Sequence, residues 1–209
     1  MAIVITVAQQ KGGAGKTTLA ANLAVAFALD GRRVAVLDID PQHSLARWHA
    51  IRATREGAAA ITLSDAAGWR LSAEVEKLSR VHDVVVIDSP PQVDTDAKVA
   101  VRAASLVLIP VQPSPPDLWA AEGTLKLAAA ERRPVRLLLN RAPASGKLRA
   151  GIERDIADGG HPVTTAALGN RVGFATAFAQ GLGILELAPN TVAGREMRAI
   201  YDEVLGYLT

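Results

Sequence analysis

The chain has 209 residues and a formal net charge of +2, and 49% of its residues are hydrophobic but only 4% are aromatic. This length and composition suit one well-buried core of small aliphatic side chains and exclude a disordered chain, so we expect a single domain over residues 1–209. The absence of cysteine excludes disulfides, thiolate metal sites and iron–sulfur clusters. A net charge of +2 does not by itself indicate nucleic-acid binding.

Apolar, β-branched runs alternate with helical segments along the chain. Continuous runs of this kind are typical of strands buried in a parallel sheet. Four clear strands are predicted at 3–7, 34–37, 84–87 and 106–111, a fifth at 135–139, and weaker candidates at 59–63 and 162–168. Helices are predicted at 17–29, 44–55, 72–79, 95–103, 115–131, 148–158, 171–180 and 191–208. The alternation predicts an α/β, doubly wound, mostly parallel sheet of about seven strands with helices on both faces.

A glycine-rich loop joins the first predicted strand to the first predicted helix. Residues 10–18 read Gln-Lys-Gly-Gly-Ala-Gly-Lys-Thr-Thr, and a strand, such a turn and a helix start form the context of a phosphate-binding loop. Lys16 can reach the β- and γ-phosphates of a nucleotide, and the Thr17 hydroxyl can ligate Mg²⁺. The residues that we expect to bind the phosphates are Gly12, Gly13, Ala14, Gly15, Lys16, Thr17 and Thr18.

The loop departs from the strict G-x-x-x-x-G-K-[ST] pattern, because Gln10 stands at the position of the first glycine. A dinucleotide-binding fold is the nearest alternative, since Gly13-x-Gly15 is followed about 20 positions later by Asp38. That alternative is disfavoured because Thr18 stands where a third glycine would allow close helix packing, and because Lys16 and Thr17 would have no role. We therefore interpret the segment as a variant phosphate-binding loop.

Aspartates follow the second and third clear strands, at the edge of a parallel sheet where ligands bind. We expect Asp40 to orient or polarise an attacking water, and Asp38 to support Mg²⁺ through a water or to fix the loop. The alternative is an ordinary acidic turn before Pro41. Asp88 ends the third clear strand in a Walker B arrangement and is expected to reach Mg²⁺ through its water shell. The Ser-Pro-Pro turn at 89–91 then lies near the γ-phosphate.

Asn140 follows the predicted strand at 135–139. Its side-chain amide offers a donor and an acceptor side by side, as needed to pair with the N6/N1 edge of adenine. The alternative is that Asn140 caps the turn from this strand into the following loop. We expect Asn140 to take part in nucleotide binding.

A proline-rich segment follows the strand that ends at residue 111. It reads Pro113-Ser114-Pro115-Pro116-Asp117-Leu118-Trp119. Ser114 is expected to cap the next helix, with Pro115 as its first residue and Asp117 as its third. A structural role in capping the helix is enough to explain such a segment. An exposed Pro-Pro pair with Leu118 and Trp119 is equally consistent with a self-association surface.

These motifs together resemble those of the ParA/MinD group of P-loop ATPases, whose deviant phosphate loop reads K-G-G-x-G-K-T-T. The resemblance is carried by residues 9–18, 38–42 and 86–88, and residues 113–117 are similar to the proline-rich segment of small ParA/ParF-type partition ATPases. It extends over nearly the whole chain. It implies one P-loop ATPase domain that uses ATP and Mg²⁺, without the N-terminal DNA-reading domain of larger ParA proteins.

The resemblance also implies how the site works. ATP binding forms a nucleotide-sandwich homodimer, in which the signature lysine reaches the phosphates of the partner subunit, and Lys11 matches that lysine. Asp40 matches the aspartate that serves hydrolysis. The expected catalytic residues are Lys11, Lys16 and Asp40, and the expected metal-binding residues are Thr17, Asp38 and Asp88. The expected dimer-interface residues are Lys11, Pro113, Pro115 and Pro116.

The resemblance further implies a dimer that binds DNA without sequence preference, and a ParB-like or other adaptor protein that stimulates its slow ATP hydrolysis. The candidate DNA-binding residues are Arg171, Arg195, Arg198, Lys147 and Arg149. Scattered surface arginines are the alternative, because residues 141–209 carry seven basic and seven acidic residues. We expect a cytoplasmic, nucleoid-associated protein that serves DNA segregation or the positioning of intracellular cargo.

Two other functions on the same scaffold stay open. A MinD-like membrane-cycling regulator would need a basic amphipathic C-terminal helix, but no lysine or arginine follows Arg198, so we expect no membrane binding. An ATP-dependent synthetase or amidoligase would need a pocket of arginines and hydroxyls for an acidic substrate, and the sequence shows no motif for one. The early first strand and the lack of a long apolar run predict neither a signal peptide nor a transmembrane helix.

Overall fold

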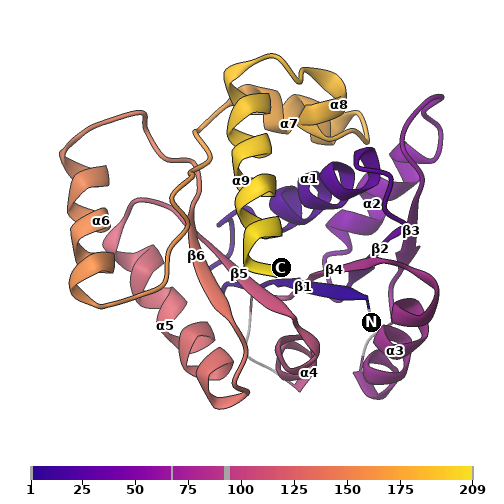
Figure 1. Ribbon diagram of the computed structural model, residues 1–209, viewed down its shortest axis with the longest axis horizontal. Helices are drawn as coiled ribbons and strands as arrows, with labels where there is room; N and C mark the ends of the chain where they lie inside the picture. Colours follow the sequence, from indigo (N-terminus) through magenta and orange to yellow (C-terminus); the bar gives the residue numbers. More distant parts are fainter. Residues whose placement is uncertain (1, 67, 92–94, 209) are drawn as a thin grey trace.

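The computed structural model describes residues 2–66, 68–91 and 95–208. Within these ranges the strands form one parallel sheet in the order β3-β2-β4-β1-β5-β6 (Figure 1). The strands are β1 (Ile3–Val7), β2 (Val34–Asp38), β3 (Ile61–Ser64), β4 (Val84–Asp88), β5 (Leu106–Val111) and β6 (Val135–Leu139). The five stronger strand predictions are confirmed, and the weaker candidate at 59–63 forms as β3.

Across the described ranges the sheet has six strands rather than about seven, because the predicted strand at 162–168 does not form. This segment runs beside β6 and meets it at an isolated bridge at Val163, and again where the N–H of Leu168 donates to the carbonyl of Leu139 at 2.9 Å. Beyond that bridge, the backbone N–H groups of Thr165 and Ala166 donate to the carboxylate of Glu203 at 2.7 and 2.9 Å. The N–H of Thr164 donates to Leu137, so a regular ladder would next use the N–H of Ala166, and Glu203 of the last helix takes that group instead.

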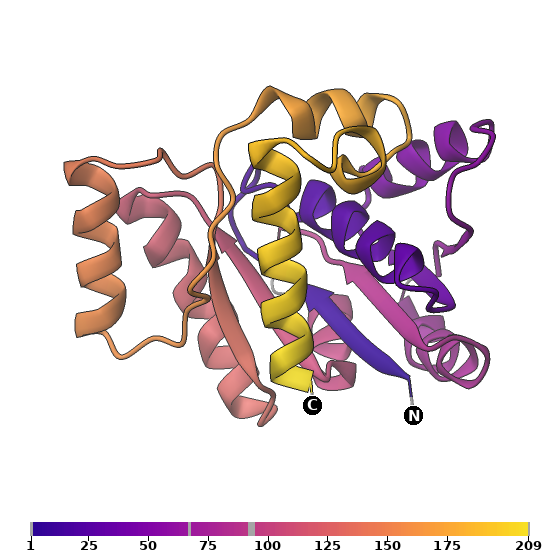
Figure 2. The ribbon, with the colours of Figure 1, turned by 45° about the horizontal axis from the view of Figure 1, so that its top comes forward.

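Helices cover both faces of the sheet (Figures 1 and 2). They are α1 (Lys16–Leu29), α2 (Ser44–Arg52), α3 (Leu71–Val81), α4 (Thr95–Ala103), α5 (Pro115–Ala130), α6 (Lys147–Asp158), α7 (Val172–Ala179), α8 (Ile184–Leu187) and α9 (Val192–Leu208). All eight predicted helices are confirmed, whereas the short α8 and the 3₁₀ turn η1 (Gly68–Arg70) were not predicted. Among the described residues, no helix combines the length and apolar character that a membrane span requires.

Two layers of core explain why the central strands are apolar at most positions. Helices α1, α2, α7, α8 and α9 pack on one face, and α3 to α6 pack on the other. Along β4, Val84 and Val86 join the first layer, while Val85 and Ile87 join the second. Because side chains of a strand alternate between faces, a strand covered on both sides has apolar side chains at nearly every position.

The carboxyl end of the sheet contains a crevice at β1. The chain passes from β1 through α1 to β2 in one half of the sheet, whereas β5 and β6 form the other half. Ligands of doubly wound sheets bind where the strand order reverses in this way. The glycine-rich loop leaves β1 at this point, and β2 and β4 end beside it in Asp38 and Asp88.

Candidate functional site

The loop between β1 and α1 has the backbone shape that its glycines predict. Gly13 and Gly15 have φ angles of 76° and 91°, in the left-handed region that residues with a Cβ rarely adopt. Gly15 caps α1, and a Cβ at this position would collide with the side chain of Asn140. The N-terminus of α1 therefore opens into the loop, where its unpaired N–H groups and dipole favour bound phosphates.

A lysine and an aspartate lie buried beneath this loop. Burial lowers the pKa of Lys16, and the Asp88 and Asp40 carboxylates raise it by less. Burial also raises the pKa of Asp88 to about 7, while the Thr17 hydroxyl and then the Lys16 ammonium act in the opposite direction. Neither carboxylate oxygen of Asp88 has a hydrogen bond of good geometry in the described part of the chain.

The surroundings of Asp88 fit a hydrated Mg²⁺ ion. Buried carboxylate oxygens without a partner are unfavourable unless a cation or water meets them, and Mg²⁺ prefers oxygen ligands together with several waters. Thr17 supplies a hydroxyl close to Asp88. Within residues that the structure describes, no three His, Cys, Asp or Glu side chains are grouped to hold a metal ion. The predicted metal site therefore depends on Thr17 and Asp88.

Asp38 and Asp40 have different surroundings. The carboxylate of Asp38 is buried, which raises its pKa, and it accepts hydrogen bonds from the N–H groups of Asp40 at 3.1 Å and Ala46 at 2.9 Å. These bonds tie the end of β2 to the start of α2, so Asp38 fixes the loop, and its support of Mg²⁺ stays a prediction. Asp40 accepts from the N–H of Gln42 at 2.9 Å and borders a cavity of about 360 Å³ next to the phosphate loop.

Lys11 is turned toward α5. Its ammonium forms an ion pair with the carboxylate of Asp117, in the first turn of that helix. The Asp117 side chain is 2% exposed and that of Lys11 is 40% exposed. Sequence reasoning missed this contact, because the two residues are 106 positions apart and no local pattern connects them. The predicted contact of Lys11 with a partner subunit's phosphates is not tested by one chain.

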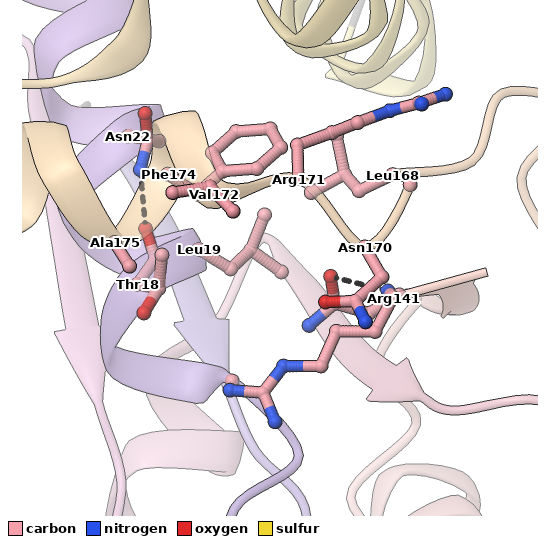
Figure 3. A pocket seen from close by; sticks show the side chains of 13 residues that line it. Thr18, Leu19, Asn22, Arg141, Leu168, Asn170, Arg171, Val172, Phe174 and Ala175 are labelled. Atoms are coloured by element: carbon pink, nitrogen blue, oxygen red, sulfur yellow. Dashed lines mark hydrogen bonds between the residues drawn. The ribbon is translucent and has the colours of Figure 1, made fainter. Parts of the chain in front are cut away.

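A second cavity, of about 270 Å³, adjoins the phosphate loop (Figure 3). Its lining includes the apolar side chains of Leu19 from α1, of Leu168 in the loop before α7, and of Phe174 from α7. Arg141 lines this cavity and also the one that Asp40 borders. An apolar cavity beside a phosphate loop is suited to the base and ribose of a nucleotide.

Asn140 lines the second cavity, but both ends of its amide are engaged within the chain. Its Nδ2 donates to the carbonyl of Ala14 at 2.7 Å, and its Oδ1 accepts from the N–H of Arg141 at 3.0 Å. The predicted contact with adenine therefore stays a prediction. Sequence reasoning missed Asn170, an exposed residue before α7 that lines the same cavity (Figure 3). Its position beyond β6 depends on the path of a long loop.

The proline-rich segment caps α5 as predicted. Ser114 Oγ accepts from the N–H of Asp117 and donates to its carboxylate at 2.5 Å. Pro115 and Trp119 are exposed beside this cap. Pro113 is buried, however, and Leu118 packs in the core with β5, so these two are not part of an exposed surface. The helix must bury one side against the sheet, and Leu118 lies on that side.

The candidate DNA-binding residues fall into two separate groups. Lys147 and Arg149 open α6, which lies away from α9 in both views (Figures 1 and 2). The other group is Arg171, Arg195 and Arg198, around the start of α7 and along α9. Arg149 forms an ion pair with Glu153, and Arg171 forms one with Glu196, each at 2.8 Å. Arg195 and Arg198 are exposed. The structure does not gather the five residues into one patch.

Residues 5–184 match the family model of the CobQ/CobB/MinD/ParA nucleotide-binding domain. Two relatives, both called maintenance of carboxysome distribution protein A, are similar over nearly their whole length. The one from Halothiobacillus neapolitanus is 29% identical over 211 residues, which cover 98% of this chain and 97% of the relative. The one from Gloeobacter kilaueensis is 35% identical over 206 residues, which cover 96% of this chain and 91% of the relative.

The fold is similar to that of the septum site-determining protein MinD of Pyrococcus horikoshii, solved in complex with Mg-ADP. The TM-score is 0.77 at 18% sequence identity, over 98% of this chain and 96% of MinD. At this identity the likeness shows a common fold alone. The family match spans most of the chain, from β1 through the phosphate loop to α8. The chain therefore belongs to the ParA/MinD family of nucleotide-binding ATPases.

Proposed function

We propose that this chain is a ParA-type ATPase that positions a cargo inside the cell. The observation that carries this proposal is the nearly full-length match to two proteins named for carboxysome distribution. It is supported by the phosphate loop, whose additional lysine at position 11 suits a site completed by two subunits. The cargo is a protein assembly or a DNA molecule that moves by cycles of ATP binding and hydrolysis.

Each part of the crevice has a role in this proposal. Lys16 and the loop N–H groups hold the ATP phosphates, and Thr17 and Asp88 hold Mg²⁺ with Asp38 behind them. Bound Mg²⁺ neutralises charge on the β- and γ-phosphates. Asp40 orients the attacking water in the cavity that it borders. Lys11 stabilises charge on the phosphates of the partner subunit.

The nucleotide controls assembly and DNA binding. ATP favours a closed homodimer only if it binds that state more tightly than the open monomer. The closed dimer binds DNA through phosphate contacts of exposed arginines, such as Arg195 and Arg198, without reading sequence. This places the protein on the nucleoid. A ParB-like protein or another adaptor stimulates hydrolysis and so releases the dimer from DNA.

Retention on non-specific duplex DNA tests the proposal. We expect retention with Mg-ATP, and none with Mg-ADP or without nucleotide. Lys16→Ala is expected to abolish ATP-dependent retention, because the phosphates lose their buried counter-charge. Asp40→Ala is expected to bind ATP and to remain on DNA after the wild-type chain has been released. Lys77→Ala, at an exposed lysine of α3, is the matched control and is expected to behave as the wild type.

Three outcomes would contradict the proposal. Equal DNA binding with ATP, with ADP and without nucleotide would overturn it directly. ATP hydrolysis that depends on a small carboxylic acid and is indifferent to DNA would indicate a synthetase. ATP-dependent binding to liposomes rather than to DNA would indicate a membrane-cycling regulator.

A further inference from the structure

Hydrogen bonds join the start of α5 to the phosphate loop at a residue before Lys11 and at a residue after it. Gln9 Nε2 donates to the backbone carbonyl of Asp117 at 3.3 Å. Gln112 Nε2, just before α5, donates to the carbonyl of Gly13 at 3.0 Å. The loop and the first turn of α5 therefore form one connected unit, with the ion pair between Lys11 and Asp117 inside it.

Asp117 depends on Lys11 for its charge compensation. Oδ2 accepts from the Lys11 ammonium and from Ser114 Oγ, and in the described residues no other cation pairs with it. Oδ1 is buried and has no hydrogen bond of good geometry among those residues. The Lys11 side chain is partly exposed and has a route outward, whereas the carboxylate is fixed in the capping turn.

The proposed function requires Lys11 to leave its own subunit. If it did so, Asp117 would keep a buried charge without a counter-ion, and such a charge strongly raises the free energy of the folded state. We propose that Asp117 is a positioning residue that retains Lys11 in the unpaired subunit and thereby makes dimer closure depend on the γ-phosphate. ADP has one phosphate fewer to offer the incoming lysine, so it does not offset the lost ion pair. This inference rests on the proposed function.

Asp117→Asn is the informative substitution. The amide has nearly the same shape as the carboxylate and can still accept from Ser114, but it carries no charge. Asp117→Glu keeps the charge and is the conservative rescue. Glu122→Gln is the matched control, because it removes a carboxylate from the same helix at an exposed position, where Glu122 pairs with Lys126 at 3.5 Å. Asp117→Ser replaces the Asn variant if that chain does not fold by circular dichroism.

The dimer fraction is measured by analytical ultracentrifugation against the concentration of Mg-ATP or Mg-ADP. We expect Asp117→Asn to dimerise at an ATP concentration on the order of tenfold lower than the wild type, as for the loss of one charge-assisted hydrogen bond. We also expect it to form dimers with ADP. Asp117→Glu and Glu122→Gln are expected to require ATP as the wild type does. In a Lys11→Ala background, Asp117→Asn is expected to change nothing.

The outcomes separate this inference from the function on which it rests. A wild-type chain that stays monomeric at saturating ATP would overturn the proposed dimer. A wild type that dimerises with ATP, together with an Asn variant that dimerises no better or more weakly, would overturn the role of Asp117 alone. An effect of Asp117→Asn that persists without Lys11 would also overturn it, because a change in helix capping needs no lysine.

Discussion

The buried carboxyl of Asp88 has its charge poorly compensated within the chain. Burial raises its pKa from the ordinary 3.8 to about 7, so between these values the folded chain binds a proton that the unfolded chain does not. Ionisation of Asp88 therefore opposes folding. The contribution of the Asp88 carboxyl to the free energy of unfolding is therefore most favourable below pH 3.8. It is lost as the pH rises to about 7. Mg²⁺ binding requires the ionised form.

Asp88→Asn tests this at the scale of one residue. We expect the substitution to raise the free energy of unfolding of the nucleotide-free chain by up to a few kcal/mol at about pH 8, and much less at about pH 5. Mg-ATP affinity is expected to fall. Urea denaturation at the two pH values and nucleotide titration are the measurements. Asp65→Asn, at an exposed aspartate, is the control, and an equal effect of Asp88→Asn at both pH values would contradict the buried charge.

At the scale of elements, α2 and α8 are held together by a buried ion pair. The Arg52 guanidinium, with its side chain 3% exposed, donates to both carboxylate oxygens of Glu186 at 2.6 and 2.8 Å. It also donates to the carbonyl of Gly181 at 3.0 Å, and it lies over the ring of Trp48. A helix as short as α8 is not stable alone, so this cluster holds it against α2.

Glu186→Gln is expected to destabilise the fold by about 3–5 kcal/mol, because it leaves the buried Arg52 charge without a counter-ion. The midpoint of urea unfolding measures this. Arg55→Met is the matched control: that exposed arginine donates to the carbonyl of Gln180 at 2.9 Å in the same region. We expect it to cost less than about 1 kcal/mol. A similar cost for both substitutions would show that burial of the pair is not what matters.

At the scale of the whole molecule, the surface beside Lys11 is the interface that we expect in the proposed dimer. The start of α5 exposes Pro115, Pro116 and Trp119 there, and Trp119 is 65% exposed. An exposed tryptophan next to rigid prolines is typical of an interface anchor. Because α5 is bonded to the phosphate loop, this surface is connected to the proposed nucleotide site.

Trp119 supplies a probe of dimer closure. Trp48 is fully buried and Trp69 is 91% exposed, so in a Trp69→Phe chain most fluorescence quenching by acrylamide comes from Trp119. We expect Mg-ATP to reduce quenching in this chain and Mg-ADP to leave it unchanged. The same chain with Lys11→Ala is the control and is expected to show no ATP effect. Unchanged quenching in a demonstrated ATP dimer would place the interface away from α5.

Much of the fold could be predicted because its signals are local. Strands covered on both faces are apolar at every position, which is visible in Val84–Ile87 without any knowledge of the partners. The segment at 162–168 has a weaker pattern of this kind and is not a strand, because Glu203 of a distant helix takes the N–H of Ala166 that would continue the ladder. The four-residue α8 has no periodicity to detect. Its position depends on Arg52, which lies far away in the sequence.

By itself the sequence determined the phosphate loop, the strand-end Asp88 and the class of sheet, since each is a short motif or a repeating pattern. Only the tertiary structure decided that Lys11 pairs with Asp117, that the Asn140 amide is engaged by the loop, and that Pro113 is buried. The physical reason is the same in each case. These contacts arise where the start of α5 and the end of β6 meet the loop that follows β1, and side chains more than a hundred positions apart share no local pattern.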